Sequence, residues 1–358
     1  MDLQVVGLRL RPPPYLKGLA PAALFLLAGV VAACRQVDGG LQTYSFQGPT
    51  MGTRYTIKIV AEDLAEERQE ELSRRIGQEL ALVDRKMSHY RKDSELSRFN
   101  RWQQTTPFSV SPETFAVFEH AQELSSLTGG ALDVTVAPLV NAWGFGPEKR
   151  SDEPPSDEHI RRLLARVGYT ALELDRTQYN LRKKNPRLEC DLSAIAKGYA
   201  VDRVAEALEA KGISDYMVEV GGEVRTGGYN AAGKPWRIAV ERPVAGDGSF
   251  QRIVSLSGLS MATSGDYRNY YEVDGVRISH EIDPRTGFPI RHRTASVSVV
   301  EPDCVRADGW ATALLVLGVE AGDALARKHD LAALFLVRED DGGFREHATP
   351  AFERLIGR

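Results

Sequence analysis

The chain has few cysteines for its length. Its 358 residues include three, of which Cys190 and Cys304 lie well inside the chain. Two thiols are too few for a disulfide framework, so a hydrophobic core must hold the fold together. One bridge between them stays open as an alternative to two reduced, buried thiols. The roughly 320 residues after the N-terminal segment can bury a sizeable core, in one large or two interlocked domains.

The chain also lacks a dominant sign of charge. It has 45 Lys and Arg against 49 Asp and Glu, which gives a formal net charge of -4, and both signs are mixed throughout. Proteins that bind nucleic acid usually carry a basic patch or stripe. We therefore expect no nucleic-acid partner.

The glycine-rich loops that commonly hold nucleotides are missing as well. No G-x-G-x-x-G follows a predicted strand, and there is no G-x-x-x-x-G-K-[ST]. The glycines at Gly144–Gly146 and Gly221–Gly222 are too short a pattern to replace them. Any nucleotide that this chain binds is therefore held outside a Rossmann or P-loop cradle.

The apolar run near the N-terminus is short. Leu19–Ala33 spans about 15 residues, whereas a membrane-spanning helix needs about 20. Basic residues precede the run, and small residues end it directly before Cys34. This layout predicts a secretory signal peptide over 1–33, and Val31–Cys34 resembles a bacterial lipobox, in which the cysteine becomes the lipidated first residue. An ordinary cleaved signal and an uncleaved anchor are the alternatives.

Hydrophobic periodicity predicts an α+β fold. Apolar residues at three- and four-residue spacing indicate helices, whereas alternation between Gly and Asp-Gly turns indicates antiparallel strands. The polar, proline-rich stretch 147–158 is a predicted surface loop and a candidate subdomain boundary. Separate helices beside such strands favour α+β over a wound parallel sheet. The predicted helices cover 63–87, 111–128, 193–211, 307–318 and 320–329, and the predicted strands cover 54–60, 216–220, 236–240, 253–256, 270–273, 294–300 and 332–337.

Two oxygen donors lie one helical turn apart near the start of the apolar run ATALLVLG. Asp308 and Thr312 have the i, i+4 spacing that places both side chains on one helix face. A carboxylate and a hydroxyl with few other ligands suit Mg²⁺, which keeps waters and uses phosphate oxygens of a substrate. Asp308 as the N-cap of a helix explains the same pattern.

A second candidate segment is Cys190–Gly198, where a predicted strand end turns into a helix. The free N–H groups of a helix start can bind a phosphate, and Lys197 adds a positive charge. Asp191 can accept a hydrogen bond from a ribose or ring donor. Ordinary capping by Ser193, with Lys197 in solvent, is the alternative.

A histidine precedes a tight turn in SHEIDPRTGFP. His280 can accept a proton from a hydroxyl nucleophile near neutral pH, and Asp283 is a candidate to orient it. The chain has seven histidines, and most of them, His89 included, stand among polar residues typical of a surface. Met51 and Tyr90 offer soft or flat surfaces for a ring system, with core packing as the alternative.

Eight segments in their order along the chain resemble the FAD:protein FMN transferase family, also called ApbE. The resemblance runs from about residue 43 to 357, which predicts one catalytic domain over 43–357 after a tether at 34–42. It implies an α+β fold with a T-fold-like antiparallel sheet region and an FAD cleft between subdomains. The segments are TMGTRYTI, MSHYRKDSELSRFN, TGGALDVTVAPLVNAWGFGP, CDLSAIAKGYAVD, VEVGGEVRTGG, TSGDYRNYYEVDG, SHEIDPRTGFPI and ADGWATALLVLG.

The resemblance assigns roles to individual positions. His280 matches the proposed base. Asp308 and Thr312 match metal ligands, a backbone carbonyl near Ala194 completes the set, and Ala311 stands where some relatives have an acidic residue. A ligand supplied by that acid would be missing here. Lys197 is Glu in some relatives, so its charge is not a family requirement. The positions that match FAD contacts are Met51, Tyr90, Ala131, Leu132, Asp133, Asp191, Lys197 and Ile282.

The function that the resemblance implies is a Mg²⁺-dependent transfer of FMN from FAD, the substrate, to a threonine hydroxyl, with release of AMP. The implied acceptors are flavoprotein subunits of membrane redox complexes. With Cys34 as lipid anchor, the enzyme is expected at the membrane, facing the periplasm, with the inner membrane favoured. Two alternatives stay open: an FAD pyrophosphatase that uses water as nucleophile, and a lipoprotein that binds FAD without catalysis.

Overall fold

The computed structural model describes residues 40–147, 153–244, 246 and 248–357. The predicted signal peptide at 1–33, the predicted lipidation site Cys34 and the tether up to residue 39 lie outside these ranges.

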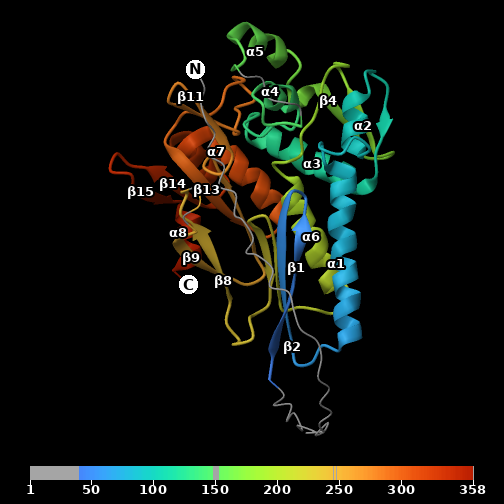
Figure 1. Cartoon of the computed structure of the whole chain (residues 1–358), viewed down its shortest axis with the longest axis vertical. Helices are drawn as coiled ribbons and strands as arrows, with labels where there is room; N and C mark the ends of the chain where they lie inside the picture. Colours follow the sequence, from blue (N-terminus) through green and yellow to red (C-terminus); the bar gives the residue numbers. More distant parts are fainter. Residues whose placement is uncertain (1–39, 148–152, 245, 247, 358) are drawn as a thin grey trace, which may run out of the picture. The chain divides into compact units, whose positions relative to one another are not determined.

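An eight-stranded antiparallel sheet forms the centre of the fold (Figure 1). Its strands Thr294–Glu301 and Ala332–Arg338 are buried along nearly their whole length, as expected where both faces of a sheet are covered. The edge strand Gln42–Thr50 instead alternates between exposed and half-buried residues. The first two strands form a hairpin whose turn holds Met51 and Gly52 at positive φ. In spatial order the strands are β1 (Gln42–Thr50), β2 (Thr53–Ala61), β6 (Tyr216–Val220), β7 (Glu223–Gly227), β10 (Ser260–Gly265), β13 (Thr294–Glu301), β14 (Ala332–Arg338) and β15 (Phe344–Ala348).

Three long helices pack in series against this sheet. α7 (Cys304–Lys328) lies on β10 and β13, α6 (Ala196–Glu209) packs on α7, and α1 (Glu66–Met87) packs on α6. The expected apolar stripe of α1 is buried throughout, at Leu72, Ile76, Leu80, Val83 and Met87. Helices beside an antiparallel sheet confirm the predicted α+β class.

α7 joins two helices that the sequence predicted separately. Gly318 has φ 73° and ψ 173°, a conformation open to glycine, and it breaks the helix near the predicted boundary. α7 is also long and apolar enough to cross a membrane by length and composition. Its side chains Trp310, Leu314 and Leu315 are buried in the protein core, which makes it a core helix.

A second apolar cluster lies under the two-stranded sheet of β8 (Trp236–Glu241) and β9 (Phe250–Leu256). β8 alternates strictly between buried and exposed residues, and its buried residues Trp236, Ile238 and Val240 join Phe352 of α8 (Pro350–Ile356). The exposed residues of β8 face the cavity described below.

Shorter elements complete the fold. The predicted helix over 111–128 is α3 (Pro112–Leu127). Ser111 caps it and accepts a hydrogen bond from the Thr114 amide, with Pro112 in the first turn. The hairpin of β11 (Tyr270–Val273) and β12 (Val276–Ser279) leads directly to His280. The remaining elements are α2 (Glu95–Arg101), β3 (Phe108–Ser109), α3 (Pro112–Leu127), α4 (Ala137–Ala142), α5 (Asp157–Leu164), a 3₁₀ turn at Tyr169–Ala171, β4 (Leu172–Asp175) and β5 (Asn180–Lys183).

Candidate active site

A cavity of about 570 Å³ brings together side chains from segments far apart in the sequence. Its walls come from the loop after α1, the loop before α4, the start of α6, the ends of β6 and β7, the exposed face of β8, and the segment that carries His280. Such a concave site with a few polar groups is the usual form of a small-molecule site. The predicted site residues that line it are Tyr90, Ala131, Leu132, Asp133, Asp191, Ala194, Lys197, His280, Ile282, Asp308 and Thr312.

α7 presents Asp308 and Thr312 to this cavity on one face, as their spacing predicted. α7 begins at Cys304, so Asp308 lies a turn inside the helix and the alternative of an N-cap at Asp308 is wrong. One oxygen of Asp308 accepts a hydrogen bond from the Gly198 amide at 2.9 Å. The Thr312 hydroxyl lies 3.0 Å from the Ser264 hydroxyl. Burial raises the pKa of the Asp308 carboxyl, and the nearby Lys197 ammonium opposes that shift.

The approach of α6 to α7 requires a glycine at position 198. A Cβ atom there would lie 2.8 Å from the Asp308 Cβ and closer still to the Cys304 carbonyl oxygen. α6 itself begins at Ala196, and its N-cap residue Ile195 forms no side-chain cap hydrogen bond. The Ser193 hydroxyl donates instead to Asp191 at 2.6 Å, so the predicted capping role of Ser193 is wrong.

Lys197 is held in the cavity wall by a residue that the sequence analysis missed. Its Nζ lies 2.6 Å from Oε1 of Glu223, which is 2 % exposed. The second oxygen, Oε2, is buried and has no hydrogen-bond partner among the described residues. Burial raises the pKa of Glu223. Burial alone would lower the pKa of Lys197, but the carboxylates of Glu223 and Asp308 raise it, so the ammonium stays charged. The signal in the sequence was an acid at a buried strand position, directly after Gly221–Gly222.

Asp191 forms a buried pair with a histidine that the sequence placed on the surface. Nδ1 of His89 lies 3.0 Å from Oδ1 of Asp191, and the His89 side chain is only 9 % exposed. The surface interpretation of His89 is therefore wrong. Burial alone would raise the pKa of Asp191, but hydrogen bonds from His89 and Ser193 lower it. The adjacent Tyr90 ring stands edge-on to His89 and is largely exposed, as a stacking surface for a ring would be.

Asp133 stabilises the loop that forms one wall of the cavity. Its carboxylate accepts hydrogen bonds from the amide and hydroxyl of Thr135 and from the Tyr169 amide, at 2.6 to 2.8 Å. Burial raises its pKa, and these hydrogen bonds oppose the shift. Ala131 and Leu132 lie in the same wall. The three positions of this loop that were predicted to contact FAD therefore line the cavity together.

His280 lies at the half-exposed side of the cavity. Its Nδ1 is 3.0 Å from the Asn269 carbonyl oxygen, and because a carbonyl only accepts, Nδ1 carries the hydrogen. Nε2, the other ring nitrogen, lies 3.4 Å from Oε1 of Glu281. Burial raises the pKa of Glu281, and His280 opposes that shift. The neighbouring carboxyl of His280 is thus Glu281.

Three predicted site residues lie away from the cavity wall. Asp283 bonds the amide and guanidinium of Arg285, so its expected contact with His280 is not formed. Ala311 is fully buried in the main apolar core, and it offers no side-chain oxygen to a metal. Met51 is half-buried and packs against the core at the β1–β2 turn.

The donor set fits magnesium. Among the described residues there is no cluster of three or more His, Cys, Asp or Glu that could enclose a metal ion. Mg²⁺ rarely needs such a cluster, since it is commonly bound by one or two carboxylates, waters and substrate phosphates. Asp308 and Thr312, with Ala194 across the cavity wall, provide such an incomplete site, which a phosphate-bearing substrate would complete.

Fold and cavity together define an α+β protein with a nucleotide-sized site lined by carboxylates, a lysine and a histidine. Comparison with known proteins identifies the family within this class. The ApbE family model matches residues 51–335, and the chain belongs to the ApbE family. FAD:protein FMN transferase of Vibrio cholerae is 47 % identical over 341 residues, which cover 95 % of this chain and 98 % of that protein. The corresponding protein of Haemophilus influenzae is 43 % identical, with 91 % and 94 % covered.

Solved structures agree with these sequence relatives. The flavin transferase ApbE from Vibrio cholerae superposes with a TM-score of 0.81 at 46 % identity, covering 88 % of this chain and 100 % of that one. The apo form of Pseudomonas stutzeri flavinyl transferase ApbE gives a TM-score of 0.81 at 41 % identity, covering 89 % and 98 %. The predicted family is thereby confirmed.

Proposed function

We propose that this chain is an enzyme that transfers FMN from FAD to a threonine hydroxyl of a target protein and releases AMP. The observation that carries the proposal is the convergence of Asp308, Thr312, Lys197 and His280 on one cavity. These residues supply what phosphoryl transfer needs: groups for the charged diphosphate and a base for the nucleophile. The names of the relatives support the same reaction.

The buried side of the cavity would bind the diphosphate of FAD. Lys197 contributes a positive charge there, held in place by Glu223 at 2.6 Å. Asp308, Thr312 and the backbone at Ala194 are the residues that would hold Mg²⁺. When bound, Mg²⁺ neutralises diphosphate charge and polarises the phosphorus.

His280 would accept the proton of the incoming hydroxyl. Because Nδ1 donates to the Asn269 carbonyl, Nε2 is the nitrogen available for this task. The threonine oxygen forms a bond to the FMN-side phosphorus, the bond between that phosphorus and the bridging oxygen breaks, and AMP leaves with the electron pair. The products are threonyl-FMN, linked by a phosphoester, and AMP.

We further propose that the enzyme works at a membrane surface facing the periplasm, with the inner membrane favoured. The support is the sequence layout alone, with a signal-like segment at 1–33 that ends before Cys34. A lipid on Cys34 would hold the enzyme in the same layer as acceptor flavoprotein subunits of membrane redox complexes.

Intact-mass analysis tests the proposed reaction. The chain is incubated with FAD, Mg²⁺ and an acceptor fragment that contains a candidate threonine, with a threonine-to-valine fragment as matched control. The proposal expects a mass gain of one FMN residue on the first fragment alone, abolished by a chelator. Free FMN and AMP with every acceptor fragment unmodified would instead support a pyrophosphatase, and FAD that stays bound and intact would support a carrier.

A further inference from the structure

The start of α7 is not stabilised by its own capping residue. The first amides of a helix lack partners within the helix, and an Asp at the N-cap commonly bonds them. Asp303 occupies the N-cap of α7 in an extended conformation, yet its side chain forms no cap hydrogen bond. The side chain of Asp303 is 53 % exposed.

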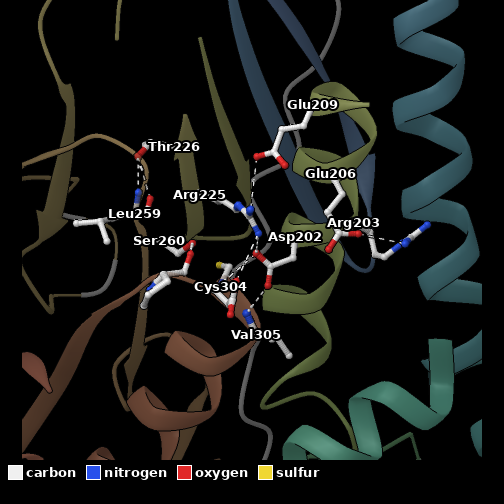
Figure 2. Close-up of polar contacts among 12 residues, drawn as sticks. Asp202, Arg203, Glu206, Glu209, Arg225, Thr226, Leu259, Ser260, Cys304 and Val305 are labelled. Atoms are coloured by element: carbon white, nitrogen blue, oxygen red, sulfur yellow. Dashed lines mark hydrogen bonds and ion pairs between the residues drawn. The ribbon is translucent and has the colours of Figure 1, made fainter. Parts of the chain in front are cut away.

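A carboxylate from another helix takes this role. Asp202, on α6, accepts hydrogen bonds from the Cys304 amide at 3.0 Å and from the Val305 amide at 2.8 Å. Figure 2 shows Asp202 between these amides and Arg225 of β7, whose guanidinium lies 2.8 Å away. Asp202 is 5 % exposed, and a buried carboxylate of this kind is tolerated only when it is paired and hydrogen-bonded.

The two helices bond each other reciprocally. α6 gives the Asp202 carboxylate to the first amides of α7, and α7 gives the Asp308 carboxylate to the Gly198 amide of α6. Gly198 and Asp202 are four residues apart, as are Cys304 and Asp308, so each pair spans one turn on one helix face. We call these three hydrogen bonds, together with the Arg225 ion pair, the α6–α7 lock.

The lock fixes the position of the site's ligands relative to one another. Asp308 and Thr312 belong to α7, whereas Lys197 lies in the first turn of α6 and Ala194 directly before that helix. A shift of α7 along α6 would separate the two groups. Asp202 itself does not line the cavity, so it touches none of the reacting groups.

We propose that Asp202 is a positioning residue of this site, which places Asp308 and Thr312 against the start of α6 by holding the first amides of α7. The expected loss of FMN transfer rests on the proposed function. The placement of Asp308 and Thr312 by Asp202 rests on the α6–α7 lock alone. A misplacement of about 1 Å at a catalytic group costs roughly 100-fold in rate.

The test compares Asp202→Ala with Asp303→Ala in the full chain. Both remove a carboxylate at the start of α7, but only Asp202 bonds its amides. For Asp202→Ala we expect a fall in kcat for FMN transfer of about 10- to 100-fold, with the KM for FAD changed less than about three-fold, since the predicted FAD contacts lie largely in other segments. Asp303→Ala is expected to stay near the parent chain, because Asp303 bonds none of these amides and the variant loses only an exposed ion pair with Arg225 at 3.8 Å. Asp202→Asn is expected to be intermediate, because its amide oxygen still accepts from the helix start but the charge pair with Arg225 is lost.

Two further readouts do not depend on activity. The first is the affinity for Mn²⁺ in the presence of FAD, measured by electron paramagnetic resonance. It should weaken about ten-fold in Asp202→Ala, which corresponds to a loss of about 1.4 kcal/mol in binding free energy. Amide hydrogen exchange should accelerate at Cys304, at Val305 and, because the lock is reciprocal, at Gly198. A circular dichroism spectrum and a thermal unfolding midpoint establish that the variant is folded, and Asp202→Asn replaces Asp202→Ala if it is not.

The outcomes separate the two proposals. Parent-like Mn²⁺ binding and parent-like protection of Gly198 in a folded Asp202→Ala variant would overturn the positioning role. Equal impairment of Asp303→Ala and Asp202→Ala would overturn it too, since that points to a general effect of charge at the helix start. If the parent chain transfers no FMN to any acceptor, the proposed function fails, yet metal binding and amide exchange still decide whether the lock positions Asp308.

Discussion

The two sides of the cavity are built differently. On the side of α6 and α7, Asp308 and Glu223 are buried in the wall. Asp308 accepts a hydrogen bond from the Gly198 amide, and Glu223 pairs with Lys197, whose side chain is 31 % exposed. On the opposite side His280 is half-exposed and is held through one backbone carbonyl next to the β11–β12 hairpin, where Tyr270 and Val276 are exposed. The buried side suits a fixed electrostatic environment for a diphosphate. The open side suits the entry of a second substrate as large as a polypeptide.

The largest expected effect comes from the buried side. Asp308→Ala removes the carboxylate that α7 presents to the cavity. We expect FMN transfer to fall by about 1,000-fold, the upper end of the range for loss of one electrostatic group. The thermal unfolding midpoint should change little, because the lost contact with the Gly198 amide is partly offset by relief of a buried charge. Full transfer by this variant in the presence of a chelator would contradict the proposed metal site.

A smaller loss is expected on the open side. His280→Ala removes the base, and general base catalysis contributes about 100-fold or more. The dissociation constant of FAD should stay near that of the parent chain, since His280 is not among the positions that match FAD contacts. Asp283→Ala is the matched control, because its carboxylate bonds Arg285 and not His280. Unchanged turnover in His280→Ala, or equal losses in the two variants, would remove His280 from the base role.

The close contact between α6 and α7 at Gly198 leaves no room for an added methyl group. Gly198→Ala places a Cβ against Asp308 and Cys304, and overpacking of this kind costs about 1–3 kcal/mol. Transfer should fall as the helices move apart. Gly77→Ala in α1 is the control. Apart from the backbone of α1 itself, no atom of the described residues lies within 4 Å of the added Cβ, so this variant should gain about 0.5–1 kcal/mol from helix propensity. Chemical denaturation of both variants measures the difference, and equal stabilities would show that α6 can shift freely.

The smallest expected effect is a change in acid stability. The pKa of Asp191 is lowered in the folded state, so the unfolded chain takes up a proton first as the pH falls. The free energy of unfolding therefore decreases as the pH drops below the usual Asp range of about 4 and through the folded pKa. Asp191→Asn should flatten this dependence in denaturation curves recorded at several pH values.

Asp133 is expected to change the free energy of unfolding with pH in the opposite direction to Asp191. Its pKa is raised in the folded state, so the folded chain takes up the proton first and this group favours folding as the pH falls. Asp133→Asn should therefore steepen the acid dependence. A change of the same sign in both variants would contradict the assigned contacts.

Local patterns revealed much of this molecule. The α1 stripe, the Ser111 cap and the one-turn spacing of Asp308 and Thr312 follow from helix geometry, which acts within a few residues. Glu223, the His89–Asp191 pair and the Asp202 cap did not emerge, because each depends on contacts between segments separated by many residues. A histidine among polar neighbours looks like a surface residue until the fold buries it. An Asp directly before a helix looks like its cap, although another helix provides that carboxylate.

The source of the oxygen that attacks FAD decides the central claim most directly. The reaction is run in water enriched in ¹⁸O with FAD, Mg²⁺ and an acceptor that contains the target threonine, and the phosphates of FMN and AMP are analysed by mass spectrometry. Transfer to threonine predicts that neither the protein-linked FMN nor the AMP gains ¹⁸O. One ¹⁸O atom in FMN or AMP, with the acceptor unmodified, would mean that water is the nucleophile and would contradict the transfer.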